Sequence, residues 1–402
     1  MNKRNLFSFV WLLALGTVSL PAQTKQAKKI GDFIESTSYN EHKRGAERTL
    51  QYYPEGDDFV CINGKNRFTR ALYGSWSPFR LETSDRPVFA AYDKRNSKHI
   101  RFLLQGRGLS VALDSIEFCE ARYTAGRRTY LLKDAALGKG TLSVSVLAFP
   151  DADGAVWKFS AKDLAEDMVL RCFISEIRAK KLSRNGDMGA DPPGCFEAPE
   201  KPQKQKEYDL PLTDEAYLVL ENLDLKLVSL DEGRRLYQKA EDARKALASC
   251  IRFTTPDPYF NTLGGALAVA ADGIWDGQVW LHGAVGWRMP LSGWRAAYTG
   301  DALGWHDRAR KHFDAYAASQ VTDVPNMIPH PAQDSALHLA RSVKKWGTPQ
   351  YSNGYICRNP RRNNQMHHYD MNLCYIDELL WHFNWTGDLE YARQMWPVIT
   401  RH

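Results

Sequence analysis

Tryptophan and histidine residues are concentrated in the last part of the chain. Nine of the twelve Trp and nine of the eleven His follow residue 251, although that part holds little more than a third of the 402 residues. Sugar rings stack their flat C–H faces on aromatic rings, and their hydroxyls need polar partners, so this enrichment suits a saccharide cleft. Large helical barrels also use these residues for packing, a role that we expect for Trp381, Phe383 and Trp396 among others.

The densest aromatic cluster lies between Trp275 and Pro290 and contains three glycines, which allow a ligand to approach the backbone closely. We expect Trp280, His282, Trp287 and Arg288 to line a sugar subsite there. Arg288 has a second role with equal support, because a guanidinium beside a helix start also braces a loop. The sequence leaves these two roles open.

A second cluster, His367 to Asn372, stands at the entrance of a predicted helix. We expect His368 and Tyr369 to contact the substrate. Asp370 is either a carboxylate that does chemistry or the cap of the helix. The adjacent histidines diverge from each other and form no HExxH-like pattern, so we expect neither a metal nor a cofactor.

The elements that must position these residues change in period along the chain. Between residues 48 and 230, short runs of Val, Phe, Tyr, Leu and Thr are separated by Gly, Asp, Asn and Lys, which predicts the antiparallel strands of a sandwich. Residues 231–249 predict a connecting helix, and residues 197–207 a solvated loop. The clearest strands are Leu109–Leu113, Phe118–Tyr123, Arg128–Leu132 and Thr141–Leu147.

After Thr255 the period becomes 3.6 residues, which predicts helices over about 257–274, 290–298, 302–319, 369–383 and 389–402. The triplets Thr299–Asp301 and Thr386–Asp388 both read Thr-Gly-Asp. Glycine suits the left-handed position past a helix and aspartate caps the next helix, so both triplets predict tight turns. The long connections, 275–289 and 320–368, then lie at the opposite end of the helices, which we expect to be the functional face.

These features together resemble the six-hairpin (α/α)6-barrel glycoside hydrolases. The phrases Asn63–Phe68 and Arg70–Gly74 are similar to those of large exported, mostly uncharacterised proteins of polysaccharide-degrading bacteria. The resemblance implies an antiparallel β-sandwich followed by a partial (α/α)6 toroid, acting on an oligo- or polysaccharide with a pair of carboxyl groups. A complete ring has twelve helices and we count five. We therefore expect a partial sequence, inactive alone, with the second carboxylate beyond His402.

Some members, including α-L-fucosidase-like ones, carry a polar residue, any residue and Asn at the entrance of an inner helix, where the pair positions a water. The matching positions here are Asp370 and Asn372, with Asp370 where those members carry Asn. The resemblance implies a base role for Asp370 and a water-orienting role for Asn372. Two alternatives stay open, a polysaccharide lyase that uses Tyr369, His368 and Arg288, and a non-catalytic glycan-binding protein.

The start of the chain has the layout of a cleaved signal peptide, with Lys3 and Arg4, an apolar run and then Pro21. We divide the chain into a signal peptide (1–22), a linker (23–46), the sandwich (47–230), a linker helix (231–250) and the partial toroid (251–402). We expect a secreted or periplasmic protein with no membrane span and no lipid-bearing cysteine. The net charge of +6 is interspersed along the chain, so we expect no nucleic-acid partner. Seven scattered cysteines predict buried small hydrophobes.

Overall fold

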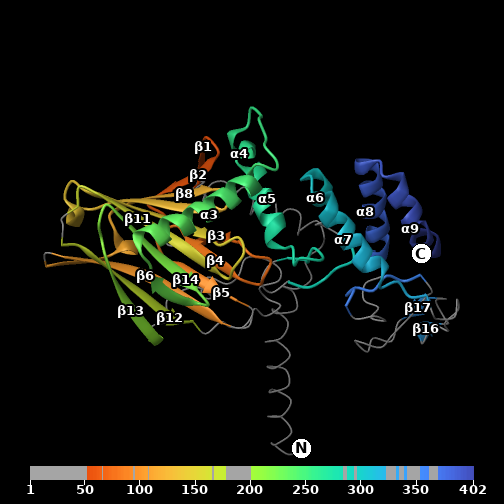
Figure 1. Cartoon of the computed structure of the whole chain (residues 1–402), viewed down its shortest axis with the longest axis horizontal. Coiled ribbons are helices and arrows are strands. Elements are labelled where there is room, and N and C mark those ends of the chain that lie inside the picture. Colours follow the sequence, from red (N-terminus) through yellow and green to blue (C-terminus); the bar gives the residue numbers. More distant parts are fainter. Residues whose placement is uncertain are drawn as a thin grey trace, which may run out of the picture. The chain divides into compact units, whose positions relative to one another are not determined.

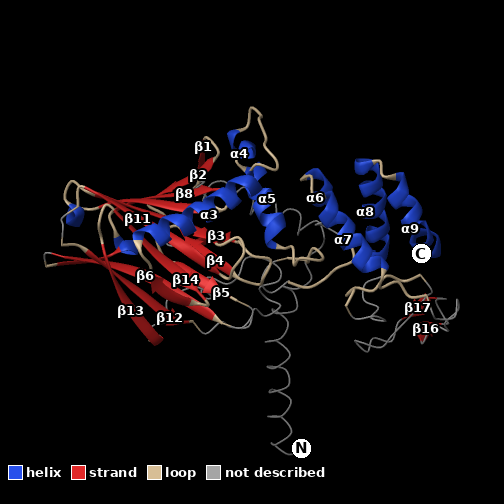
Figure 2. Ribbon diagram, in the orientation of Figure 1, coloured by secondary structure: helices blue, strands red, loops and turns tan. Residues whose placement is uncertain are grey.

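The computed structural model describes residues 52–65, 67–93, 96–106, 108–164, 167–177, 201–283, 288–293, 297–322, 332–334, 339–341, 354–361 and 370–402. All of these residues belong to one compact unit, Tyr52–His402. Antiparallel β-sheets fill its first half and helices its second half, as the sequence predicts (Figures 1 and 2). Among the described residues, every helix is too short or too polar to cross a membrane.

The strands form two antiparallel sheets. The first has the order β1-β2-β8-β9-β10-β11-β14-β15, and the second has the order β13-β12-β6-β5-β4-β3 with β7 beside β6. The first sheet contains β1 (Tyr53–Glu55), β2 (Asp58–Ile62), β8 (Phe118–Thr124), β9 (Arg127–Lys133), β10 (Thr141–Ala148), β11 (Gly154–Lys162), β14 (Glu215–Glu221) and β15 (Asp224–Leu227). The second contains β3 (Phe68–Leu72), β4 (Arg80–Ser84), β5 (Phe89–Tyr92), β6 (Ser97–Gly106), β7 (Leu109–Ala112), β12 (Val169–Glu176) and β13 (Gln203–Pro211).

Alternation along the strands places one side chain in two in the core between the sheets. In β9 every second residue is buried, and β8 and β10 show the same pattern. Aromatic rings from the two sheets meet edge to face, with ring centroids 5.4 Å apart for Phe89 and Trp157 and 5.8 Å apart for Phe89 and Tyr130. This shared core makes the two sheets a sandwich.

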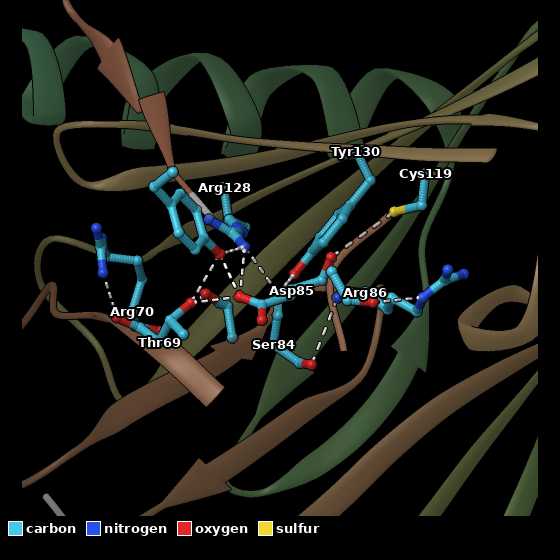
Figure 3. A network of polar contacts seen from close by, with 11 residues as sticks. Thr69, Arg70, Ser84, Asp85, Arg86, Cys119, Arg128 and Tyr130 are labelled. Atoms are coloured by element: carbon cyan, nitrogen blue, oxygen red, sulfur yellow. Dashed lines mark hydrogen bonds and ion pairs between the residues drawn. The ribbon is translucent and has the colours of Figure 1, made fainter. Parts of the chain in front are cut away.

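A polar network is enclosed within the sandwich (Figure 3). The Arg128 guanidinium donates to the Tyr52 hydroxyl at 2.7 Å and to the Ser84 carbonyl at 3.0 Å, and it lies 3.8 Å from the Asp85 carboxylate. Asp85 also accepts hydrogen bonds from Tyr52 and Thr69. Because both charges are fully buried, each depends on the other and on these hydroxyls for compensation. The network therefore supports the fold.

Helix α3 (Leu230–Ala248) covers the outer face of the first sheet. Ser229 caps its start by accepting a hydrogen bond from the N–H of Glu232. Its buried Ala240 packs with Val156 and Val219 of the sheet. Two further helices follow, α4 (Pro258–Asn261), which Asp257 caps, and α5 (Leu263–Gly273). Helix α5 packs on α3, so the second half of the unit is attached to the sandwich through α3.

Four helices lie side by side after α5: α6 (Ala297–Ala302), α7 (His306–Ala317), α8 (Asp370–Thr386) and α9 (Leu389–Arg401) (Figure 1). Two short strands, β16 (Ala332–Asp334) and β17 (Leu339–Arg341), follow α7 in the sequence and pair with each other. A continuous core joins the helices to the segment after α5. Its buried members include Trp280, Phe313, Tyr316, Tyr375 and Tyr391. Closure of these helices into a toroid stays a prediction.

The first Thr-Gly-Asp triplet is not the turn that we predicted. It lies inside α6, and the left-handed glycine is Gly304, with φ of 75°, just before α7. Asp301 caps no helix and instead accepts hydrogen bonds from His306 and His382. The second triplet follows the prediction, because Gly387 has φ of 63° and Asp388 caps α9.

Two other predicted elements are corrected. Residues 288–293 are not helical, so the described helix of this region begins at Ala297 rather than at residue 290. Residues 203–207 of the predicted solvated loop form the first half of strand β13, although their side chains are exposed. Cys61, Cys119, Cys172 and Cys357 are buried, Cys374 is partly buried and Cys250 is exposed. Cys195 lies outside the described residues.

Candidate functional site

The segment between α5 and α6 is an ordered loop over its described residues. Asp276 accepts the backbone N–H groups of Gln278 and Val279 at 3.0 and 2.8 Å, and Gly277 takes φ of 94°. This Asx-type turn returns the chain, so that Leu281 N–H donates to the carbonyl of Ile274, one residue past the end of α5. Residues 275–281 of the predicted aromatic cluster are therefore held against the end of α5.

Trp280 is a core side chain of this loop, with 1 % of its surface exposed. Its ring packs against Trp275, with centroids 4.8 Å apart, and lies against the backbone of Gly300. Its backbone N–H donates to Nδ1 of His312 at 3.2 Å. In this structure Trp280 positions the loop and offers no open face for stacking on a sugar.

Arg288 acts as a brace. Its guanidinium donates to the carbonyls of Gly273 and Trp275, at the end of α5, and to the carbonyl of Trp76 in the sandwich. Burial lowers the pKa of Arg288 from its ordinary value. Carbonyls at a helix C-terminus attract a cation, so the geometry favours the bracing role over the substrate-binding role that the sequence left equally open.

Five other predicted site residues are described only in part or lie outside the described residues. His282 is partly exposed on the loop, and its N–H donates to the carbonyl of Met289 at 2.9 Å. Asp370 is the first residue of α8, and its side chain lies outside the described part. Trp287, His368 and Tyr369 also lie outside the described residues.

Asn372 is buried in the first turn of α8, where its amide is bound to the backbone. The side-chain oxygen accepts the N–H of Ile356 at 2.7 Å, and the side-chain nitrogen donates to the carbonyl of Ile356 at 3.1 Å. Asn372 therefore holds the incoming segment 354–361 against α8. This pairing uses both ends of the amide, and the water-orienting role stays a prediction without geometric support.

The structure nevertheless brings the two predicted clusters together. His312 of α7 links the loop to itself, because it accepts from Trp280 N–H and contacts the Ser292 carbonyl at 3.3 Å. The Ser292 hydroxyl reaches the carbonyl of Met371, next to Asp370, at 3.4 Å. Segment 354–361 crosses the same place, where Arg361 donates to the Asp276 carboxylate at 2.8 Å. Three segments distant in sequence thus meet at one end of the helices.

Several polar residues at this end were not among the predicted site residues. Tyr316 of α7 is fully buried, and burial raises its pKa well above the ordinary value, with Asp276 and Glu378 adding to the rise and Arg361 and Arg358 opposing it. Burial also acts to raise the pKa of Asp276, but its two backbone N–H bonds and Arg361 outweigh burial and lower the pKa overall. Asp276 is therefore an ionised brace and not a general acid.

The sandwich contributes an unpredicted aromatic residue to this region, Trp76 in the connection between β3 and β4. Its ring meets Trp275 edge to face, with centroids 6.5 Å apart, and its Nε1–H donates to Asp272 of α5 at 3.3 Å. The only sequence signal was a lone tryptophan beside the phrase Arg70–Gly74, 200 residues away from the aromatic cluster. Long-range packing of this kind leaves no periodic trace.

A cleft of about 470 Å³ lies on the sandwich itself. Its lysines are paired with carboxylates, since Lys98 and Lys204 both reach Glu176 and Lys206 reaches Asp224. The single aromatic residue among its described lining, Phe79, is buried. Without an exposed ring among its described lining, this cleft offers less for stacking on a ligand than the region around Trp76.

Comparison with known proteins gives one family match. Residues 96–232, from β6 to the start of α3, match the model of a family described as a domain of unknown function, DUF4450. No curated protein matches the chain.

Among solved structures, a bacterial glucoamylase complexed with acarbose is similar over 65 % of this chain and 53 % of its own, with 9 % identity and a TM-score of 0.35. The chain thus spans about half the length of that neighbour. A TM-score this low carries no argument about function.

Proposed function

We propose that this protein is a glycoside hydrolase whose helical half binds the substrate at the end of the helices where the long connections lie. The observation that supports this most directly is the convergence of the loop after α5, segment 354–361 and the first turn of α8. Short turns at Gly304 and Gly387 occupy the other end. Function in such architectures is carried by the loops, while the packed helices hold the loops in place.

Asp370 fits one half of the required chemistry. It is the first residue of α8, where the free backbone N–H groups and the helix dipole stabilise a negative charge. A carboxylate at such a position can accept a proton from an attacking water, which is the base role in an inverting hydrolase. We therefore assign Asp370 the base and look elsewhere for the acid.

The acid is not one of the other carboxylates of α8. Glu378 lies eight residues further along, which is about 12 Å along the helix axis and longer than the roughly 6.5–9.5 Å between the carboxyl groups of an inverting pair. The Asp377 carboxylate accepts a hydrogen bond from Tyr298. The second catalytic carboxyl group in this proposal comes from outside α8.

Elimination by a lyase has less support. The cation expected for it, Arg288, donates to three carbonyls. The tyrosine that the structure does place here, Tyr316, is buried with a raised pKa, which opposes the loss of a proton.

The test uses the protein expressed from its complete reading frame and a panel of neutral and acidic polysaccharides. We expect new reducing ends and products whose mass increases by one water per bond. In Asp370→Asn we expect kcat to fall by about a hundredfold or more with little change in KM, because only the base function is removed. Asp388→Asn is the matched control, since Asp388 also starts a helix, at the opposite end, and asparagine caps equally well.

Two outcomes would overturn this proposal. Full turnover by Asp370→Asn would remove Asp370 from the chemistry. Products that absorb in the ultraviolet because they carry a new double bond would identify a lyase instead.

A further inference from the structure

Trp76 is an exposed indole that is held in one orientation. Although 47 % of its surface is exposed, its Nε1–H donates to Asp272 and its ring edge meets Trp275. Gly277 lies against the ring, and Arg288 holds its backbone carbonyl. An exposed tryptophan usually varies its rotamer, whereas these contacts from two different parts of the fold fix this one.

A charged pair lies beside the ring. The Arg308 guanidinium of α7 donates to Asp272 at 2.7 Å, and its central carbon lies 4.4 Å from the ring centroid of Trp305 and 5.3 Å from that of Trp76. Both described hydrogen bonds to the Asp272 carboxylate end on the same oxygen, Oδ1. Cation–π contacts and the ion pair together immobilise both polar groups.

Trp76, Asp272 and Arg308 line a cleft of about 220 Å³ between the sandwich, α3, α5 and α7. Val269 and Leu247 form an apolar wall, and Tyr73 and Arg244 also line it. Arg244 is neutralised by Glu241, with N–O distances of 2.8 and 2.7 Å. The volume equals about seven liquid waters at roughly 30 Å³ each, which suits one sugar ring and not a long chain.

We propose that this cleft is a subsite for a single neutral sugar ring. One C–H face of the ring packs on Trp76, hydroxyl groups donate to the Asp272 carboxylate, and other hydroxyls accept from Arg308. Because each charge in the cleft is paired, no net charge is left to recruit a uronic acid or an amino sugar. The subsite deepens the proposed function and rests on it only for the class of ligand.

This assignment gives the sandwich a part in recognition. Trp76 comes from the β3–β4 connection, whereas Asp272 and Arg308 come from the helical half. Each half alone would lack either the aromatic face or the polar partners. The subsite therefore exists only while Trp76 is bound to α5.

The experiment measures binding without turnover. The full chain is titrated with glucose, galactose, mannose and xylose, and saturation-transfer NMR together with tryptophan fluorescence reports the contact. We expect at least one sugar to bind and Trp76→Ala to weaken its affinity by about tenfold or more, because the stacking face is lost. Trp76→Phe keeps a face and should lose less. Trp381→Ala, which removes a similarly exposed tryptophan from α8, should bind like the wild type.

Equal affinity in Trp76→Ala and wild type would overturn the proposal, as would the absence of binding by every sugar of the panel. Glucuronic acid binding more tightly than glucose would contradict the neutral class. Because none of these readouts needs bond cleavage, loss of this subsite and failure of the hydrolase proposal can be told apart. Circular dichroism of each variant confirms that it is folded.

Discussion

His312 shows at the residue scale how the candidate site is held. A backbone N–H, that of Trp280, can only donate, so Nδ1 of His312 accepts it, and Nε2 carries the hydrogen that faces the Ser292 carbonyl. The ring is therefore neutral in the folded protein. Burial lowers its pKa to about 4 and outweighs the opposing effects of Ser292 and Asp276.

This pKa predicts a loss of stability in acid. Between pH 6.5 and 4 the unfolded chain binds a proton at residue 312 that the folded chain does not, so the free energy of unfolding decreases as the pH falls through that window. The contribution of this one group is at most about 3 kcal/mol. Urea unfolding from pH 7 to pH 4 should show a shallower pH dependence in His312→Asn than in the wild type. Parallel curves for the two proteins would contradict the prediction.

Residue type located this region better than it predicted the role of each side chain. Trp280 was expected to contact a sugar, but the structure buries it. For Arg288 the sequence left a bracing and a binding role open, and the geometry favours the brace. A sequence shows that an aromatic ring is present and not which way it faces. Trp76 was missed for the converse reason, since its partners Asp272 and Arg308 are supplied by a distant part of the chain.

At the scale of elements, strands were easier to predict than helix ends. The alternation of apolar and polar residues predicted both ends of β8, β9 and β10 to within one residue. It did so because the side chains of these strands alternate between core and surface. The two Thr-Gly-Asp triplets look alike but serve different purposes. Gly387 is a turn residue, whereas Gly300 is a helical residue that makes room for Trp280. Only the packing partner distinguishes them.

Gly300→Ala tests that difference. In an open helix this change stabilises by about 1 kcal/mol, but here the new Cβ would lie 2.3 Å from the Trp280 ring. We expect the free energy of unfolding to decrease by about 1–3 kcal/mol, the usual cost of overpacking, and the near-ultraviolet circular dichroism to change. In a Trp280→Phe background the smaller ring should make the same substitution less costly. A Gly300→Ala variant more stable than the wild type would show that the ring moves aside freely.

At the scale of the whole molecule, the sequence predicted the order of the parts and not their closure. Helical periodicity reports that each helix has a buried face, but it carries no information on how many helices complete a ring. The structure adds the connection between the two halves. Helix α5 packs on α3, and Trp76 contacts Asp272 and Arg288. The sandwich is therefore part of the candidate site and not only a neighbour of it.

The outer faces of α8 and α9 carry large apolar side chains in contact with solvent. Pairs of helices in a toroid pack on neighbours at both sides, so the proposed architecture assigns these faces to a further helix pair. A chain of residues 1–402 on its own should then bury them by self-association. These side chains are Leu373, Leu380, Trp381, Trp385, Leu389 and Trp396.

Sedimentation velocity checks this prediction over a range of protein concentrations. We expect the average sedimentation coefficient of the wild-type chain to increase with concentration, and that of the double variant Trp381→Glu with Trp396→Glu to stay at the monomer value. Leu227→Glu is the control, because it adds a charge at an equally exposed apolar residue of the sandwich and should associate like the wild type. If the wild type stays monomeric at all concentrations, these helix faces need no partner, and the case for a further helix pair in contact with α8 and α9 fails.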